Sequence, residues 1–195
     1  MRAGRMTGKA VIFEAMPTGD AQRIWDGGPD AYGNPPERAV SDGSGLPCRH
    51  CLQMIADGKP YLIIAYCPFE SITPYAETGP VFLHADPCQR AESSGELPQS
   101  LDSPSYLVRG YSDDQRIVYG TGSVVARVDV SRYAGALFAN PAVAFVDVRS
   151  ASNNCFQCRI LADDQMDIMP GQAARAGIKP GAQISVPYRH KAQCT

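Results

Sequence analysis

The sequence predicts an α+β fold, a single domain in which a largely antiparallel β-sheet is accompanied by a few short helices. Runs rich in β-branched and aromatic residues outnumber helical patterns along the chain. Two of these runs flank a polar loop at residues 112–115, which is typical of a β-hairpin. The chain also contains 18 glycines and 16 prolines, which favour turns and short elements over long helices.

The predicted strands are short apolar runs separated by turn residues. They lie at residues 10–15, 61–66, 80–84, 106–111, 116–119, 124–130, 142–148 and 155–161. The run at 61–66 (YLIIAY) is apolar without interruption, so we expect it to be a central, buried strand. A further run at 181–188 (GAQISVPY) can form an edge strand near the end of the chain.

Three short helical segments are expected between these strands. The first covers residues 21–25 and follows Thr18, whose side chain can cap a helix. A single helical turn is expected at 53–58, where it ends on a glycine. The third segment, residues 132–139, follows the capping residue Ser131 and stops before an Asn-Pro pair.

Length and composition restrict the class of protein. A chain of 195 residues can bury the core of one domain, which we expect over residues 1–165, with 166–195 as a C-terminal extension. A net charge of −2 provides no positive field that would attract nucleic acid or anionic lipid. No apolar run approaches the roughly 18 residues that a membrane-spanning helix needs. We therefore expect neither nucleic acid nor a membrane as a partner.

The cysteines indicate a reducing compartment. The apolar run at 11–13 ends at Glu14 and is too short for a secretory signal. The chain has seven cysteines, an odd number that fits poorly with a closed set of disulfides. They are Cys48, Cys51, Cys67, Cys88, Cys155, Cys158 and Cys194. We expect a cytoplasmic protein, in which clustered cysteines bind metal or act in catalysis more often than they form disulfides.

Two C-x-x-C motifs predict a metal site, with zinc as the expected ion. Cys48 and Cys51 follow a long loop at residues 29–47, and Cys155 and Cys158 begin a predicted strand. Four thiolates complete a tetrahedral zinc site, so these four cysteines are the first-choice ligands, in a structural role. The motifs lie 104 positions apart, whereas common zinc modules separate their two pairs by about 15–20 residues.

Two further residues can replace members of that set. His84 and Cys88 lie four positions apart, and imidazole and thiolate both suit zinc. His50 lies between the cysteines of the first motif and is expected to point away from an ion that they hold. The alternative to metal binding is that the cysteines are small buried hydrophobic residues.

A metal-dependent enzyme with an open zinc position, hydrolase or deaminase-like, is an alternative function. Residues 47–51 match the P-C-x-x-C half of the zinc nucleobase-deaminase signature, and residues 84–86 (HAD) resemble its H-x-E half. The two halves occur in reversed order, and aspartate replaces glutamate. In such a site Asp86 or Glu77 would accept the proton.

A thiol-disulfide oxidoreductase that uses Cys48 and Cys51 is a further alternative. Arg49 and His50 would stabilise a thiolate there, but a redox C-x-x-C normally follows a strand in a βαβ unit. Three arginines in or beside predicted strands could line an anion pocket, although paired or solvated arginines are the more common arrangement. They are Arg109, Arg149 and Arg159.

Several motifs in order resemble a known family. They begin with Pro47-Cys48-Arg49, continue through residues 74–84 (PYAETGPVFLH) and end with residues 150–155 (SASNNC). This pattern resembles the bacterial domain-of-unknown-function family numbered twelve hundred and three, over roughly residues 13–161. The resemblance implies a single-domain bacterial protein and transfers no activity to it.

Overall fold

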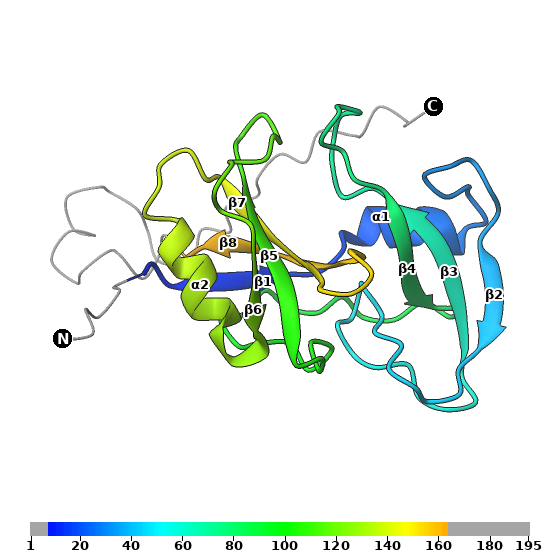
Figure 1. Cartoon of the computed structure of the whole chain (residues 1–195). Coiled ribbons are helices and arrows are strands. Elements are labelled where there is room, and N and C mark those ends of the chain that lie inside the picture. Colours follow the sequence, from blue (N-terminus) through cyan, green and yellow to red (C-terminus); the bar gives the residue numbers. More distant parts are fainter. Residues whose placement is uncertain (1–7, 164–195) are drawn as a thin grey trace, which may run out of the picture.

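The structure is a computed structural model that describes residues 8–163. Within these residues the elements are, in order, β1 (Val11–Glu14), α1 (Thr18–Trp25), β2 (Glu37–Val40), β3 (Pro60–Tyr66), β4 (Gly79–His84), β5 (Ser105–Tyr111), β6 (Ser123–Ala126), the 3-10 helix η1 (Arg127–Asp129), α2 (Val130–Leu137), β7 (Phe145–Ser150) and β8 (Phe156–Ala162). The strands form two antiparallel sheets, ordered β1-β8-β7-β5-β6 and β2-β3-β4. Figure 1 shows the two sheets side by side. The predicted α+β class with mainly antiparallel pairing is confirmed.

Two expected elements in the first half of the chain differ from the prediction. The long loop at 29–47 contains β2, a short edge strand that pairs with β3. Residues 53–58 form turns instead of a helical turn. Leu52 adopts a left-handed conformation with φ of 52° directly before this segment, which is incompatible with entry into a right-handed helix.

The second half differs at the hairpin after β5. The run at 116–119 is a loop that makes one isolated bridge, between Ile117 and Tyr111. Strand β5 pairs instead with β6 on one side and with β7 on the other. The strand expected at 124–130 ends at Ala126, because η1 and α2 begin there. The expected boundary at 165, the edge strand at 181–188 and Cys194 lie outside the described residues.

The main core lies on one face of the five-stranded sheet. Alternate residues of its strands, such as Val108, Val148 and Ile160, are fully buried there. Helix α2 covers this face and contributes Val130 and Ala134 to the same core. Both α-helices within residues 8–163 are eight residues long, far short of a helix that could cross a bilayer.

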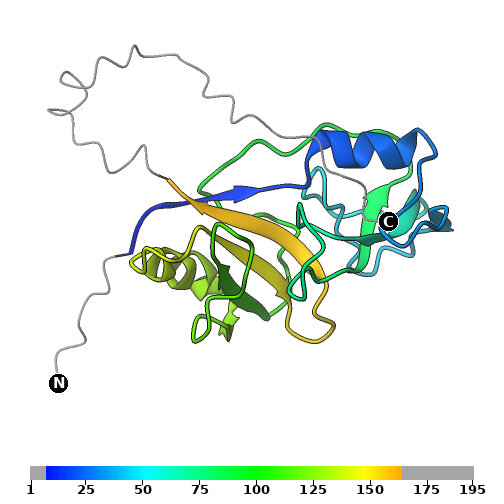
Figure 2. The same ribbon diagram turned by 90° about the horizontal axis from the view of Figure 1, so that it is seen from above.

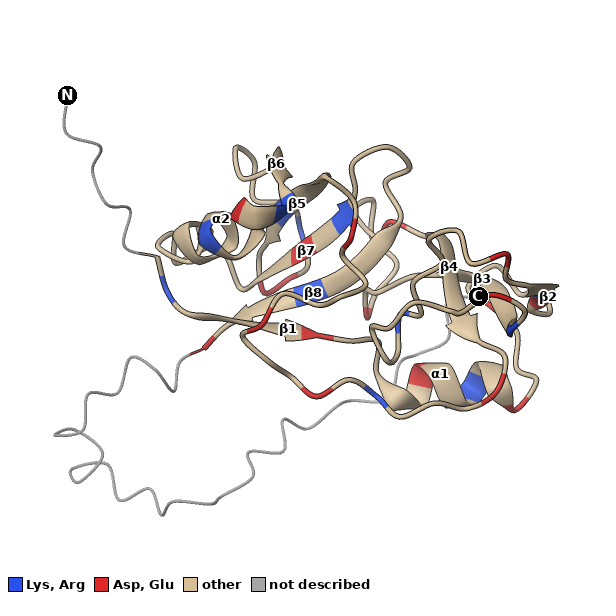
Figure 3. Cartoon of the chain, turned by 90° about the horizontal axis from the view of Figure 1, so that it is seen from below, with Lys and Arg blue, Asp and Glu red and all other residues tan. Residues whose placement is uncertain are grey.

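The opposite face of this sheet carries charged residues. Glu14, Arg159, Asp147 and Arg109 lie opposite one another on β1, β8, β7 and β5, so that charge alternates across four strands. Figure 3 shows this alternation of red and blue. Asp147 is completely buried and accepts hydrogen bonds from Nε and Nη2 of Arg159 at 2.8 and 3.2 Å. Opposite charges in such cross-strand positions stabilise the register of the strands.

A second core lies between the three-stranded sheet and α1. Ala21 and Ile24 of α1 pack with inward residues of β3 and β4, among them Ile64 and Leu83. In the view of Figure 2, α1 (blue) lies across these strands. Cys48 belongs to the same core and is fully buried, which places the first C-x-x-C motif at the edge of the small sheet.

The ion pair on the polar face gives a prediction about stability. Asp147→Asn removes the charge that pairs with Arg159, so we expect the free energy of unfolding to fall by about 3–5 kcal/mol. Asp129→Asn is the matched control, because its ion pair with Arg132 is exposed and worth at most about 0.5 kcal/mol. Urea unfolding measures the free energy of unfolding of both variants, and equal decreases in the two would contradict the prediction.

Candidate metal centre

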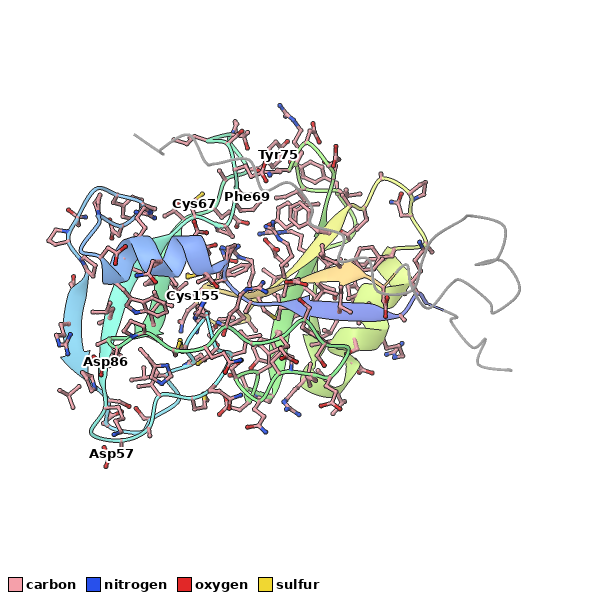
Figure 4. The ribbon with its side chains drawn as sticks, turned by 180° about the vertical axis from the view of Figure 1, so that it is seen from behind. Asp57, Cys67, Phe69, Tyr75, Asp86 and Cys155 are labelled. Carbon is pink, nitrogen blue, oxygen red and sulfur yellow. The ribbon has the colours of Figure 1, made fainter. Side chains whose placement is uncertain are left out.

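Four potential metal ligands meet at one end of the small sheet. The thiols of Cys48, Cys51 and Cys88 and the imidazole of His84 place one ligand atom each within 4.8 Å of one another. We call these four residues the Cys/His cluster. Cys48 is fully buried, and the other three are partly exposed. Figure 4 labels Asp86, which lies between His84 and Cys88 in the chain.

Two distances within the cluster match the edges of a tetrahedron around one ion. With bonds of about 2.3 Å to sulfur and about 2.0–2.1 Å to nitrogen, tetrahedral zinc separates two sulfurs by about 3.8 Å and a sulfur from a nitrogen by about 3.6 Å. The Sγ atoms of Cys48 and Cys88 are 3.8 Å apart. Sγ of Cys51 lies 3.5 Å from Nδ1 of His84. One ion at the centre could therefore reach all four atoms.

The turn at residues 48–51 is fixed by backbone hydrogen bonds. The N–H of Leu52 donates to the carbonyl of Cys48 at 3.0 Å, and the left-handed φ of Leu52 then reverses the chain. The N–H of Arg49 donates to the carbonyl of Phe82 at 3.0 Å, which attaches the turn to β4. The backbone N–H groups of Cys51 and Gln53 face the sulfurs of Cys48 and Cys51. These donors favour thiolates at both positions.

Strand β4 delivers the other half of the cluster. His84 is its last residue, and its backbone N–H points at Sγ of Cys48 at 3.5 Å. The indole N–H of Trp25 donates to the carbonyl of His84 at 2.9 Å, so α1 holds the end of the strand. Cys88 follows after a short bend and completes the cluster.

The three thiols share protons unevenly. The thiols of Cys51 and Cys88 donate hydrogen bonds to Cys48, and these bonds lower the pKa of Cys48 far below its usual value. The same bonds to Cys48, together with burial, raise the pKa of Cys51 and Cys88. The cluster thus favours one thiolate that receives hydrogen bonds from two thiols. A bound divalent cation would replace these protons and favour three thiolates.

His50 lies outside the four-ligand group but contacts one member of it. Its Nδ1 is 3.4 Å from Sγ of Cys88, and its Nε2 is 3.0 Å from Oγ1 of Thr18. The ring also packs edge-on against Trp25, with centroids 5.1 Å apart. With a Cys88 thiolate, Nδ1–H donates to the sulfur and Nε2 accepts the hydroxyl proton of Thr18. Such bonds orient a ligand and tune its affinity for metal.

An open hollow of about 190 Å³ adjoins the cluster. Its lining residues are Lys59, Pro60, His84, Asp86, Pro87 and Cys88. The exposed side chain of Asp86, the first of the two proposed proton acceptors, therefore lies beside two of the cluster residues. Glu77, the second, is instead bonded to Arg109 and Tyr111 on the polar face of the large sheet.

The second C-x-x-C motif does not join the cluster. Cys158 lies within β8 and points into the core of the large sheet, where it is fully buried. Cys155 is partly exposed, and its thiol faces the carbonyl of Asn153 at 3.6 Å. The buried side chain of Arg49 extends from the 48–51 turn to β8, where its Nε donates to the carbonyl of Phe156 at 2.5 Å. Of the first-choice ligands, the structure brings together only Cys48 and Cys51, and it adds both substitutes to them.

Sequence reasoning missed the residues that support the cluster. Thr18 and Trp25 lie 32 and 59 positions from their partners His50 and His84. Neither motif nor spacing connects residues so far apart. The three arginines considered for an anion pocket all lie near acidic partners, as expected: Arg109 and Arg149 near Glu77, and Arg159 near Asp147.

The matched family covers this region. Residues 45–161 match the family described as "Protein of unknown function (DUF1203)". The chain belongs to the DUF1203 family. The matched range includes the whole Cys/His cluster and the second C-x-x-C motif, and the resemblance inferred from the sequence is confirmed. Neither a curated protein nor a solved structure matches the chain.

The contact between His50 and Cys88 gives a prediction about affinity. His50→Phe removes a donor to the Cys88 sulfur, so we expect the affinity for zinc to fall about 10–100-fold with one ion still bound. Competition with a chromophoric chelator measures the change. Asp86→Asn is the control and should leave the affinity unchanged. Thr18→Val removes only the hydrogen bond to Nε2 of His50 and should lower the affinity for zinc by a smaller factor. Equal zinc affinities in the unaltered protein and all three variants would contradict the role assigned to His50.

Proposed function

We propose that this DUF1203 protein binds one zinc ion through Cys48, Cys51, His84 and Cys88, and that the ion has a structural role. The agreement of the 3.8 and 3.5 Å separations with the edges of a zinc tetrahedron carries this proposal. The ion would join the 48–51 turn to the end of β4.

The number of ligands supports a structural role. Four protein ligands fill a tetrahedral ion and leave no position for water or substrate. The surrounding chain also has little regular structure, since residues 41–59 and 85–104 contain no helix or named strand. A metal ion stabilises such segments by cross-linking them, in place of a larger apolar core.

The donor chemistry supports zinc as the ion. Three thiolates and one imidazole are a common set for structural zinc, whereas calcium and magnesium prefer oxygen ligands. The six cysteines within the described residues are all free. This is consistent with a reducing compartment, and we propose the cytoplasm, with neither nucleic acid nor a membrane as partner.

The hollow beside the cluster supports a second candidate, a metal-dependent enzyme with an open position. His84 and Cys88 face this hollow, together with Asp86. If water replaced one of the four ligands, Asp86 would be in reach of it as a proton acceptor, as in a hydrolase or a deaminase-like site. Four possible protein ligands lie close together, which favours a closed site and makes this candidate secondary.

A thiol-disulfide oxidoreductase is supported less well. Hydrogen bonds from Cys51 and Cys88 lower the pKa of Cys48, which favours a thiolate there, but its side chain is fully buried. A thiolate must be accessible to attack a disulfide in another protein. The hydrogen bonds that stabilise the Cys48 thiolate therefore fit metal binding better than thiol exchange.

Metal content tests the proposed zinc site. We expect about one zinc per chain in protein purified without a metal-affinity step, and loss of that zinc in Cys48→Ser and Cys88→Ser. Removal of zinc by a chelator should also lower the melting temperature. Elemental analysis and thermal unfolding measure these two effects.

The second C-x-x-C motif supplies matched controls for this test. Cys155→Ser and Cys158→Ala change the same residue type outside the cluster, so both should retain one zinc per chain. Loss of zinc in Cys155→Ser would contradict the ligand set, and absence of zinc from the unaltered protein would contradict the proposed function.

A further inference from the structure

A second group of polar residues converges on one carboxylate. Glu77, in the loop before β4, accepts hydrogen bonds from the polar face of the large sheet. Arg109 and Tyr111 of β5 both donate to its Oε2, the tyrosine at 2.7 Å. Asn154 donates to its Oε1 at 3.2 Å. We call Arg109, Tyr111, Arg149 and Asn154 the arginine cradle.

Arg149 is the unusual member of this cradle. Its side chain is almost completely buried, and its Nε donates to the carbonyl and the side-chain oxygen of Asn154, both at 3.0 Å. Its Nη1 is buried, has no hydrogen-bond partner and lies 3.7 Å from Oε2 of Glu77. A buried donor of a charged group without a partner is costly, so the cradle holds more donors than one carboxylate satisfies.

The positive charges beside the cradle outnumber the carboxylates that are paired with them. Arg109, Arg149 and Arg159 carry three positive charges, against two negative charges on their partners Glu77 and Asp147. Glu14, on the same face, is paired with a further arginine, Arg90. Burial alone would raise the pKa of Glu77, but the bond from Tyr111 and the arginines hold it below its usual value. A phosphate monoester dianion in place of Glu77 would balance the three arginines, and its three oxygens would accept more of the converging donors.

The segment that carries Glu77 is attached mainly by polar contacts. None of residues 70–80 is buried, although Phe69 directly before them is. Besides the bonds of Glu77, the N–H of Glu70 donates to the side chain of Gln115 at 2.9 Å, and the hydroxyls of Tyr75 and Tyr119 are 3.5 Å apart. Ala76 packs against the apolar group that contains Phe69 and Tyr111, and few other apolar contacts must break for the segment to move.

We propose that the arginine cradle binds the phosphate group of a small molecule and that Glu77 occupies this place in its absence. The ligand displaces Glu77, and the donors of Arg109, Tyr111 and Arg149 bind the phosphate oxygens. Tyr75, two residues before Glu77, packs edge-on against the exposed Tyr119, and we expect these rings to contact the organic part of a phosphate ester. The phosphate exchanges for the carboxylate without any covalent step.

Removal of the competing carboxylate tests the site. In Glu77→Ala the carboxylate no longer competes for the cradle. We therefore expect inorganic phosphate to bind at least about tenfold more tightly than in the unaltered protein, a change of about 1.4 kcal/mol in binding free energy. Calorimetry at matched ionic strength measures the affinity. Glu70→Ala, in the same segment, is the control and should show no gain. A gain below twofold in Glu77→Ala overturns the proposal.

Two further variants exclude other sources of the gain. Adding Arg109→Gln to Glu77→Ala should abolish the tighter binding, whereas Arg132→Gln, which removes an exposed arginine paired with Asp129, should leave it intact. If Glu77→Ala is unstable, phosphate should raise its melting temperature more than acetate does. A gain that survives Arg109→Gln, or acetate that binds as tightly as phosphate, overturns the proposal.

Binding of phenyl phosphate tests whether the site prefers a phosphate ester or free inorganic phosphate. Tighter binding of phenyl phosphate than of inorganic phosphate to Glu77→Ala identifies an ester, and equal or weaker binding identifies the free ion; either result supports the phosphate site. In the unaltered protein, saturating phenyl phosphate should accelerate amide hydrogen exchange in residues 70–78. Unchanged exchange at saturation would exclude the displacement of Glu77.

Discussion

The attachment of the 48–51 turn to β4 is the contact on which the Cys/His cluster depends. The N–H of Arg49 donates to the carbonyl of Phe82 at 3.0 Å, and Cys48 and Phe82 form a parallel bridge beside the otherwise antiparallel small sheet. This contact places two cysteines from a loop next to the end of a strand. His84 and Cys88 then complete the ligand set without any further rearrangement of the chain. The burial of Cys48 in the core around α1 holds the turn in this position.

Much of the fold could be predicted because most of its strands are apolar. The runs that became β3 and β4 carry alternating buried residues, and their composition identifies them without knowledge of their partners. Strand β2 (ERAV) was missed because it lies at an edge and none of its residues is buried. The charged row across β1, β8, β7 and β5 was also beyond prediction. Its members are ordinary isolated charges in the sequence, and only the strand register brings them together.

The candidate site could also be predicted only in part from the sequence. Spacing indicated the local pairs, Cys48 with Cys51 and His84 with Cys88, and the structure brings these four residues close together. Which pairs combine depends on contacts between distant segments. The regular alternation of side chains in β8 turns Cys158 into the main core, and Arg49 extends to that strand from the 48–51 turn. The structure therefore groups the first C-x-x-C motif with His84 and Cys88, and not with the second motif.

Strand β4 connects the two sites that we propose. The segment with Glu77 leads directly into its first residue, Gly79, and His84 is its last. Glu77 and His84 are seven positions apart, about 23 Å of extended chain, so the two proposed ligands would act at opposite ends of one strand. A zinc ion at His84 would fix the far end of β4 while the segment with Glu77 exchanges its polar contacts for those of a phosphate. The structural ion would then keep the displacement of Glu77 local, because the rest of the strand could not shift with it.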